Sequence, residues 1–300
     1  MVAGRTADIR PRIDEGLVRR LVDTQFPQWA ELVLEPVEPT GSDHVIYRLG
    51  EQPAVRLPCH AGAIGQARKE YEWLPRLAPH LPLAVPVPMA VGEPDFGHPW
   101  PWAVSRWLKG EVATVDALGD SYEAAIELAG FLVALQRFTP ENAPAGNTGG
   151  HLAGRPLSDR DRATRIAIAE VNGAFDATAM TDLWNEALSA PGWDRRSPVW
   201  FHGDFHTGNL LTSDGRLSAV IDFGELGTGD PARDLMIAFT LMSPTSRAAF
   251  RDALGVDDAT WLRGRGWALA TGLNAYTTYA AVDPRVAAQT SRQITQALIG

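Results

Sequence analysis

The side chains best suited to chemistry lie within residues 199–234. Asp204, Asn209 and Asp222 follow one another there at short spacings. Two short apolar pieces flank Asp214-Gly215, a dipeptide that strongly favours a two-residue hairpin turn. Asn209 stands just before the first piece and Asp222 just after the second, so the hairpin would bring them to the same end. Asp204 lies on the loop that leads in.

These three residues suit phosphoryl transfer. A nucleoside triphosphate and its Mg²⁺ need hard oxygen ligands, which an amide and a carboxylate supply. The attacking hydroxyl needs a second carboxylate that orients it in line and accepts its proton. Protein kinases carry His-Arg-Asp, four residues, Asn, and then Asp-Phe-Gly. The same order appears here as His202-Gly203-Asp204, four residues, Asn209, and Asp222-Phe223-Gly224, although Asp204 or Asn209 taken singly could be a loop-capping residue.

The segment HGDFHTGNLL, followed by IDFGELGTGDPARDL, resembles the aminoglycoside phosphotransferase family, and the order of elements resembles it along nearly the whole chain. The superfamily also includes choline, homoserine, methylthioribose and macrolide kinases. The resemblance implies a protein-kinase-like fold that binds ATP or GTP between two lobes. It implies Asp204 as the catalytic base and Asn209 and Asp222 as Mg²⁺ ligands. It also implies that His202 helps to hold the loop and that Asp234 braces the loop from the following helix.

The periodicity of apolar residues predicts an α+β chain, with a strand-rich first third and a helical remainder. We expect a two-lobed, protein-kinase-like fold in which an antiparallel sheet lobe precedes a larger helical lobe. Residues 1–107 would form the nucleotide-binding lobe, and residues 108–300 the lobe with the catalytic loop and the substrate pocket. Strands are expected at 32–37, 44–49, 54–57, 87–91 and 102–107. Helices are expected at 13–24, 66–77, 121–138, 159–171, 181–189, 231–241, 246–254 and 260–279, with a loop at 140–154.

The third expected strand offers the cation that kinases place over the nucleotide phosphates. That residue is Arg56, where the usual residue is Lys. Arginine keeps the charge but has a broader, planar head. Its carboxylate partner on the next helix is expected to be Glu70, with Glu72 as the alternative. If Arg56 has no such role, it would be an ordinary surface residue of a strand.

The rest of the nucleotide site is less distinct in the sequence. No G-x-G-x-x-G stands between the first two expected strands, and the only candidate phosphate loop begins at Gly41. Ser42 in that loop could donate to a phosphate, although a plain β-turn is an alternative. The connection between the lobes, residues 105–108, is expected to pass the purine base. Trp107 in it is a candidate contact with the base or a core residue.

Two features separate the chain from a protein kinase and favour a small acceptor. Gly203 replaces the Arg that grips a phosphorylated activation loop. Only a few residues separate Asp222-Phe223-Gly224 from the next expected helix, which leaves no platform for a peptide. We expect an aminoglycoside-type or other antibiotic as acceptor, or alternatively a metabolite of the choline, homoserine or sugar type. The acceptor pocket should involve residues 155–185, 225–230 and 257–280. Acidic side chains there that could bind amines are Asp159, Asp161, Glu225, Asp257 and Asp258.

The composition limits the partners. The formal net charge of −9 argues against nucleic acid as the main partner. No run of about 18 uncharged apolar residues predicts a membrane span, and residues 1–15 have no apolar core typical of a secretory signal. The single cysteine, Cys59, fits a reducing cytoplasm. The sequence leaves open the oligomeric state and the choice between ATP and GTP.

Two other functions remain as alternatives. A metal hydrolase is suggested by His202-x-Asp204-x-His206, but none of the seven histidines follows His206, and such sites usually recruit further histidines. A non-catalytic nucleotide-binding scaffold is suggested by Arg56 and the weak glycine loop. Metal analysis of the purified protein separates the first from a kinase. A slow Mg²⁺-dependent hydrolysis of nucleotide would distinguish an enzyme from such a scaffold.

Overall fold

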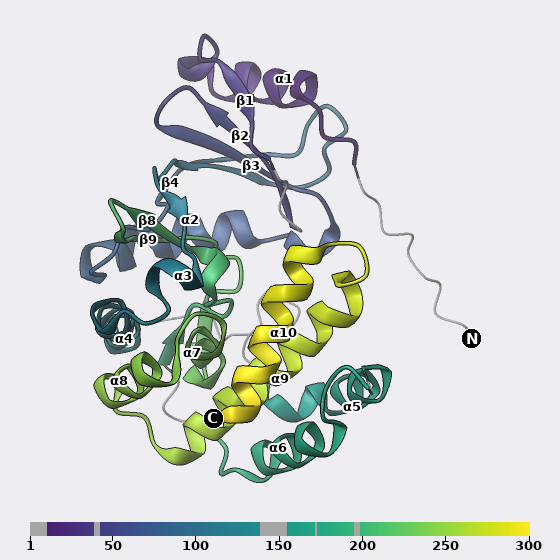
Figure 1. The fold of residues 1–300 in the computed structure, drawn as a ribbon. Coiled ribbons are helices and arrows are strands. Elements are labelled where there is room, and N and C mark those ends of the chain that lie inside the picture. The colour runs from purple at the N-terminus through teal and green to yellow at the C-terminus, as the bar shows by residue number, and fades with distance from the viewer. Residues whose placement is uncertain (1–10, 39–42, 139–154, 172, 195–198) are drawn as a thin grey trace.

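The computed structural model describes residues 11–38, 43–138, 155–171, 173–194 and 199–300. Figure 1 shows an antiparallel sheet in the N-terminal third and a larger, mostly helical region formed by the rest of the chain. The α+β fold class predicted from the sequence is confirmed. Within these described ranges, no helix is both long enough and apolar enough to cross a bilayer.

The N-terminal sheet has five strands in the order β1-β2-β3-β5-β4, with every neighbouring pair antiparallel. The strands are β1 (Leu34–Pro36), β2 (His44–Leu49), β3 (Pro53–Pro58), β4 (Pro88–Gly92) and β5 (Trp102–Arg106). Helix α1 (Glu15–Gln25) begins after Asp14, whose side chain accepts the amide hydrogen of Leu17. The apolar side chains of α1 pack on the sheet. The central strand β3 is buried at every position, so Arg56 lies in the interior.

The helical region is built around one central helix, α9. Its helices are α3 (Val115–Leu118), α4 (Tyr122–Arg137), α5 (Asp161–Glu170), α6 (Ala177–Ser189), α7 (Ile237–Thr240), α8 (Pro244–Leu254), α9 (Asp258–Tyr279) and α10 (Pro284–Ile299). Helix α9 packs against α5, α6 and α10. Most side chains between Thr260 and Leu273 are buried, as expected of a helix surrounded by other elements.

Five short strands in this region carry the candidate catalytic segment. They are β6 (Glu111–Val112), β7 (Val199–Phe201), β8 (Leu210–Ser213), β9 (Arg216–Val220) and β10 (Gly227–Gly229). Strands β8 and β9 form the hairpin predicted from the sequence. Asp214 and Gly215 at its turn both have positive φ, 52° and 75°, as the favoured two-residue turn requires. The hairpin is therefore confirmed, together with its turn residues.

Helix α2 (Gln66–Leu77) connects the sheet to the helical region. Its Trp73 and Leu77 belong to the large hydrophobic core of that region, while its Glu70 is buried on the side of β3. The chain after α2 also contacts the helical region, because Ala84 exchanges backbone hydrogen bonds with Ser218 and Val220 on β9. The orientation of α2 is thus fixed from both sides.

Several expected elements differ in detail. Residues 231–241, expected as one helix, form a 3₁₀ helix, η6 (Pro231–Met236), followed by α7. Helix α6 starts four residues earlier than expected because Asp176 caps the amides of Thr178 and Ala179. The expected helix at 159–171 begins as a 3₁₀ turn, η4 (Leu157–Arg160), before α5. Five further elements, β6, β7, β10, α3 and α10, were not predicted from the sequence. The expected loop at 140–154 lies outside the described residues.

The core beneath the catalytic segment gives a test of the fold. Phe131 of α4 stacks on Phe205, with ring centroids 5.7 Å apart and planes 6° from parallel, and both side chains are fully buried. We expect Phe131→Ala to lower the free energy of unfolding by about 3–5 kcal/mol, because it removes buried apolar surface and leaves a cavity. Tyr122→Ala on the same helix, where the side chain is 67% exposed, should change it by less than about 0.5 kcal/mol. Urea unfolding followed by circular dichroism measures both. A similar loss in the two variants would contradict the packing described.

Candidate active site

The loop after β7 owes its shape to a glycine. Gly203 has φ of +89°, a value that side chains other than glycine rarely adopt. A Cβ added there would stand 2.4 Å from the carbonyl oxygen of Glu225. This contact explains why glycine occupies the position where protein kinases have Arg. The loop and the segment after Asp222-Phe223-Gly224 are in direct contact at this point.

A buried carboxylate fixes the same loop. Asp234 accepts the amide hydrogen of His202 at 2.7 Å on one oxygen and that of Gly203 at 2.8 Å on the other. Its side chain is fully buried. Burial raises the pKa of Asp234 to about 7, against the two amide hydrogen bonds, which favour the carboxylate form. Asp234 thus holds the loop, as the family resemblance implies.

His202 connects the loop to the hairpin. Its Nε2 lies 3.0 Å from the carbonyl oxygen of Ile221, and its Nδ1 accepts the amide hydrogen of Asp204 at 3.2 Å. Burial lowers the pKa of His202 to about 4, so the ring is neutral at physiological pH. This contact pattern requires the tautomer with the proton on Nε2. His202 therefore orients Asp204 rather than carrying a charge.

The three candidate catalytic residues come together as the hairpin predicts. Asn209 donates from Nδ2 to the backbone carbonyl of Asp204 at 2.9 Å and to its Oδ2 at 3.2 Å. The amide of Ile221 donates to the carbonyl of Asn209 at 2.9 Å, which sets Asp222 beside Asn209. Asp222 itself has φ of +61°, which is uncommon for a residue with a side chain and frequent at functional sites.

Asp204 has a second neighbour, His206. Nε2 of His206 lies 3.4 Å from Oδ2 of Asp204. Burial alone would raise the pKa of Asp204, but the charge and hydrogen bond of His206 outweigh it and hold that pKa well below the usual range. The pKa of His206 is raised in turn, because the nearby Asp204 outweighs the effect of burial. Asp204 is therefore an ionised carboxylate at neutral pH.

Arg56 joins the sheet to this site. Its Nη1 donates to Oε2 of Glu70 at 2.7 Å and its Nη2 to Oδ1 of Asp222 at 3.2 Å. Glu70 is 1% exposed, whereas Glu72 points to solvent, so Glu70 is the partner of Arg56. Burial opposes the charge of Arg56, but Glu70 and Asp222 raise its pKa. A charged guanidinium thus lies against a candidate metal ligand.

Three polar groups on β2 and α2 were not predicted from the sequence as part of the site. Lys69 donates to the carbonyl of Gly224 at 2.7 Å, and Gln66 donates to Asp43 at 3.2 Å. His44 is 5% exposed, and burial together with the charge of Arg56 lowers its pKa to about 3. Only tertiary contacts single out these residues, so no local sequence signal marks them.

Two further nucleotide contacts were expected from the sequence, Ser42 and Trp107. Ser42 lies outside the described residues. Trp107 donates its amide hydrogen to the carbonyl of Gln52 at 2.5 Å, and the guanidinium of Arg48 lies 5.5 Å from its ring centroid. It lines a pocket of about 260 Å³ that includes Gln52 and Lys109. Contact of Trp107 with a base stays a prediction.

The residues present fit Mg²⁺ bound together with a nucleotide. Oδ1 of Asn209 and Oδ2 of Asp222 accept no hydrogen bond from the described residues, so two hard oxygens are open. Within the described part of the chain, no three His, Cys, Asp or Glu side chains converge as metal ligands. Mg²⁺ commonly takes one or two protein oxygens, and substrate phosphates and water supply the rest.

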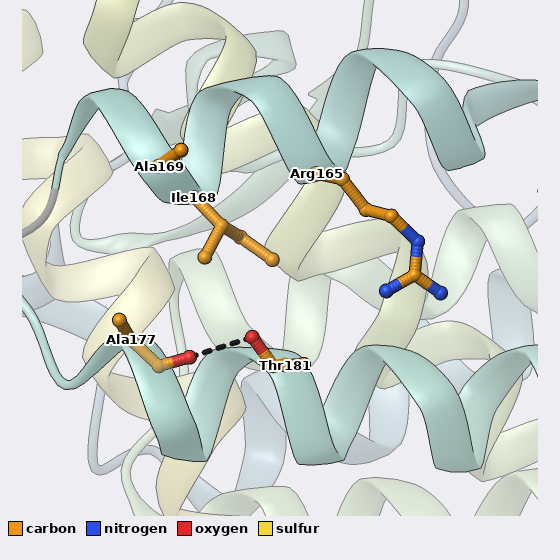
Figure 2. Close-up of a pocket in the computed structure, with 5 residues that line it drawn as sticks. All are labelled: Arg165, Ile168, Ala169, Ala177 and Thr181. Carbon is orange, nitrogen blue, oxygen red and sulfur yellow. Dashed lines mark hydrogen bonds between the residues drawn. The ribbon is translucent and has the colours of Figure 1, made fainter.

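Helix α5 borders two hollows in the helical region. One lies between α5 and α6, where Figure 2 shows Arg165 and Ile168 above Ala177 and Thr181. Its polar groups are occupied, because Thr181 donates to Ala177 and Arg165 donates to Asp161. The other, of about 220 Å³, lies between α5 and α9. It is lined by Arg160, Thr164, Glu170, Ala270, Asn274 and Thr277.

Of the five acidic residues proposed from sequence as amine-binding groups, four have hydrogen-bond partners, and Glu225 lies only within ion-pair distance of Arg233. Four of them lie beside an arginine, and the fifth caps a helix. The pairs are Asp159 with Arg155 at 3.4 Å, Asp161 with Arg165 at 2.8 Å, Glu225 with Arg233 at 3.8 Å, Asp258 with Arg251, and Asp257 with the amide of Thr260 at 2.7 Å. These five side chains do not form a free acidic surface.

Comparison with known proteins now adds to the geometry. A family model described as the phosphotransferase enzyme family matches residues 34–267. No curated protein matches the chain.

Solved structures match over almost the whole length. The GDP and kanamycin complex of APH(2")-IIia has a TM-score of 0.71 at 18% identity, covering 94% of this chain and 98% of that one. The streptomycin–ATP complex of APH(2")-IIa has a TM-score of 0.57 at 15% identity, covering 95% and 99%. The macrolide 2'-phosphotransferase MphH from Brachybacterium faecium has a TM-score of 0.59 at 21% identity, covering 93% and 97%. At such identities the likeness supports a shared fold.

The role of the Arg56–Glu70 pair in nucleotide binding can be tested by substitution, with Glu72, two positions after Glu70, as the control. Glu70→Gln should weaken binding of ATP or GTP by about tenfold or more, because the buried guanidinium loses the charged acceptor that orients it. Glu72→Gln, on the solvent side of the same helix, should leave affinity unchanged. Calorimetric titration with each nucleotide and Mg²⁺ measures the effect. If both variants bind like the wild type, Arg56 does not need Glu70 for its role.

Proposed function

The chain belongs to the phosphotransferase enzyme family, and we propose from this premise that it moves the γ-phosphate of ATP or GTP to a hydroxyl of a small molecule. The observation that carries the proposal is the convergence of Asp204, Asn209 and Asp222 at the end of one hairpin, with Arg56 on Asp222. Residues 1–107 are proposed as the nucleotide-binding lobe and residues 108–300 as the lobe that holds the acceptor.

Asp204 is the proposed base. Its carboxylate is ionised at neutral pH and its side chain is 40% exposed, so an acceptor hydroxyl can reach it. The acceptor oxygen forms a bond to the γ-phosphorus while the bond from that phosphorus to the β–γ bridging oxygen breaks. The hydroxyl proton passes to Asp204, and the nucleoside diphosphate leaves. Asn209 and His202 hold Asp204 in place through the hydrogen bonds described above.

Arg56 is the proposed cation for the phosphates. Its guanidinium lies between Glu70 and Asp222 and donates a hydrogen bond to each. Mg²⁺ bound with the nucleotide would neutralise the negative charge of the phosphates. Asn209 and Asp222 would hold that ion through their open oxygens. Trp107 and Ser42 remain proposed contacts of the base and of the phosphates.

The acceptor is proposed to be a hydroxyl-bearing antibiotic or metabolite. The fold relatives include proteins whose structures hold kanamycin or streptomycin and macrolide phosphotransferases. A screen of aminoglycosides, macrolides and hydroxylated metabolites, with release of ADP or GDP coupled to a colour change, tests the proposal directly. Acceptor-dependent release supports it. Failure of the protein to bind either nucleotide in the presence of Mg²⁺ would refute it.

The base is tested by one substitution. Asp204→Asn keeps the size of the side chain and its contact with Asn209 but cannot accept the proton. We expect kcat to fall by about 10²–10⁴-fold, the usual contribution of a positioned base, with nearly unchanged nucleotide affinity. Steady-state kinetics with the acceptor found in the screen, or nucleotide hydrolysis without it, measures kcat. Turnover close to that of the wild type would remove Asp204 from the mechanism.

The metal site is tested at Asp222. Asp222→Asn suits the positive φ, because asparagine tolerates it, but it removes the charge of a proposed ligand. Affinity for the Mg²⁺–nucleotide should drop by tenfold or more, and turnover should fall with it. Asp252→Asn, at an exposed position on α8, controls for the loss of one negative charge. Equal affinities of the two variants in calorimetry, with and without Mg²⁺, would show that Asp222 is not a ligand.

A further inference from the structure

Arg233 in η6 is a buried cation, and two of its nitrogen atoms lack a hydrogen-bond partner among the described residues. Its side chain is 8% exposed, and both Nε and Nη1 are buried without an acceptor. The nearest carboxylate oxygen, Oε2 of Glu225, is 3.8 Å from Nη1, too far for a hydrogen bond. That oxygen is itself buried and unpaired. The other described contact is the ring of Trp267, whose centroid lies 5.4 Å from the guanidinium carbon.

Such an arrangement is costly in the absence of a ligand. A guanidinium has five N–H donors and no acceptor, and a buried donor that lacks a partner costs about 1–3 kcal/mol, or more when charged. Another buried arginine among the described residues does have acceptors. Arg247 donates to the carbonyls of Ala238 and Gln296. The open donors of Arg233 therefore indicate an acceptor that comes from outside the described residues.

Arg233 lies between the catalytic loop and the hollow beside α5. The backbone of its neighbour Glu225 touches Gly203, which precedes Asp204. On the other side is Arg160: burial, and then the positive charge of Arg233, lower the pKa of Arg160. Arg160 lines the pocket between α5 and α9. Arg160 thus lines the pocket, and Arg233 lies beside the loop that carries the proposed base.

The pocket adds further open donors. Nε of Arg160 is buried without a partner, and so is the hydroxyl of Thr164, which is 2% exposed as a residue. The one acidic side chain among the described lining residues is Glu170, which points to solvent. Two guanidinium groups and a hydroxyl match the oxygens of a carboxylate, which arginine can bind through two parallel hydrogen bonds. A polyamine, which also donates hydrogen bonds, would leave these donors unsatisfied.

We propose, on the premise of the function above, that the acceptor substrate carries a carboxylate near its reactive hydroxyl, and that Arg160 and Arg233 bind this carboxylate. The hydroxyl then faces Asp204, because Arg233 and the base flank the same loop. The volume of about 220 Å³ is below the range of about 300–1,000 Å³ typical of pockets for drug-sized ligands. The acceptor is accordingly a compact hydroxy acid.

Malonate, a small dicarboxylate without a hydroxyl, tests the site apart from turnover. The protein is first saturated with Mg²⁺ and a non-hydrolysable ATP analogue, so that Arg56 is occupied. Malonate is then titrated by calorimetry. We expect saturable binding at one site, weakened about tenfold or more in Arg160→Gln, since a hydrogen bond to a charged group contributes about 1.5–3 kcal/mol. Arg165→Gln, on the side of α5 that faces α6 in Figure 2, is the matched control and should bind like the wild type.

A second variant guards against indirect effects. Arg233→Gln, with its fold verified by circular dichroism, should also lose malonate binding while it still binds the Mg²⁺–nucleotide. Absence of saturable binding in the wild type, or equal binding by the Arg160 and Arg165 variants, would overturn the proposal. Nucleotide binding that depends on Mg²⁺ is the separate readout of the proposed function. A protein that binds nucleotide but not malonate is a phosphotransferase with another acceptor class, and one that binds malonate but no nucleotide fails the proposed function alone.

Discussion

The geometry of the site depends on the two hydrogen bonds that Asp234 accepts from the backbone of His202 and Gly203. They bend the chain after β7 into a turn that a residue with a Cβ could not follow. The turn lets His202 reach Ile221 on the neighbouring hairpin. A buried carboxylate has few low-energy alternatives to these amides, so the side chain of Asp234 fixes the backbone that leads into Asp204. The β8–β9 hairpin then brings Ile221, just after its second strand, back to Asn209, just before its first.

Arg56 extends this constraint into the sheet. Its guanidinium, on β3, contacts both Glu70 on α2 and Asp222, the proposed metal ligand. Buried ion pairs contribute little to net stability, because desolvation offsets their attraction. Their use here is to fix position, because Glu70 and Asp222 each accept a hydrogen bond from the same guanidinium. Because α2 also anchors in the helical core, a shift of α2 would move the cation relative to Asp204.

The sequence predicts what is decided locally and misses what is decided by packing. The β8–β9 hairpin follows from Asp214-Gly215, and residues 66–77 are found as helix α2 with the expected bounds, because turn chemistry and periodicity are local. Strands β7 and β10 have three residues each, too few for a pattern. Helix phase alone could not choose between Glu70 and Glu72. No sequence pattern singles out Arg233 either, because its buried donors without partners are visible only in the folded structure.

The acidic net charge of −9 says little about the sign of the acceptor site. Charge in this chain is arranged in short-range pairs, so the acidic residues near the pocket are neutralised by arginines or used as helix caps. At physiological salt, exposed charges more than about 8 Å away are largely screened. What an incoming molecule meets in a partly buried pocket is the set of donors left without a partner. Those donors belong to Arg160 and Thr164 in the pocket and to Arg233 beside the catalytic loop, so the proposed recognition of the acceptor relies on local cations in a protein that is anionic as a whole.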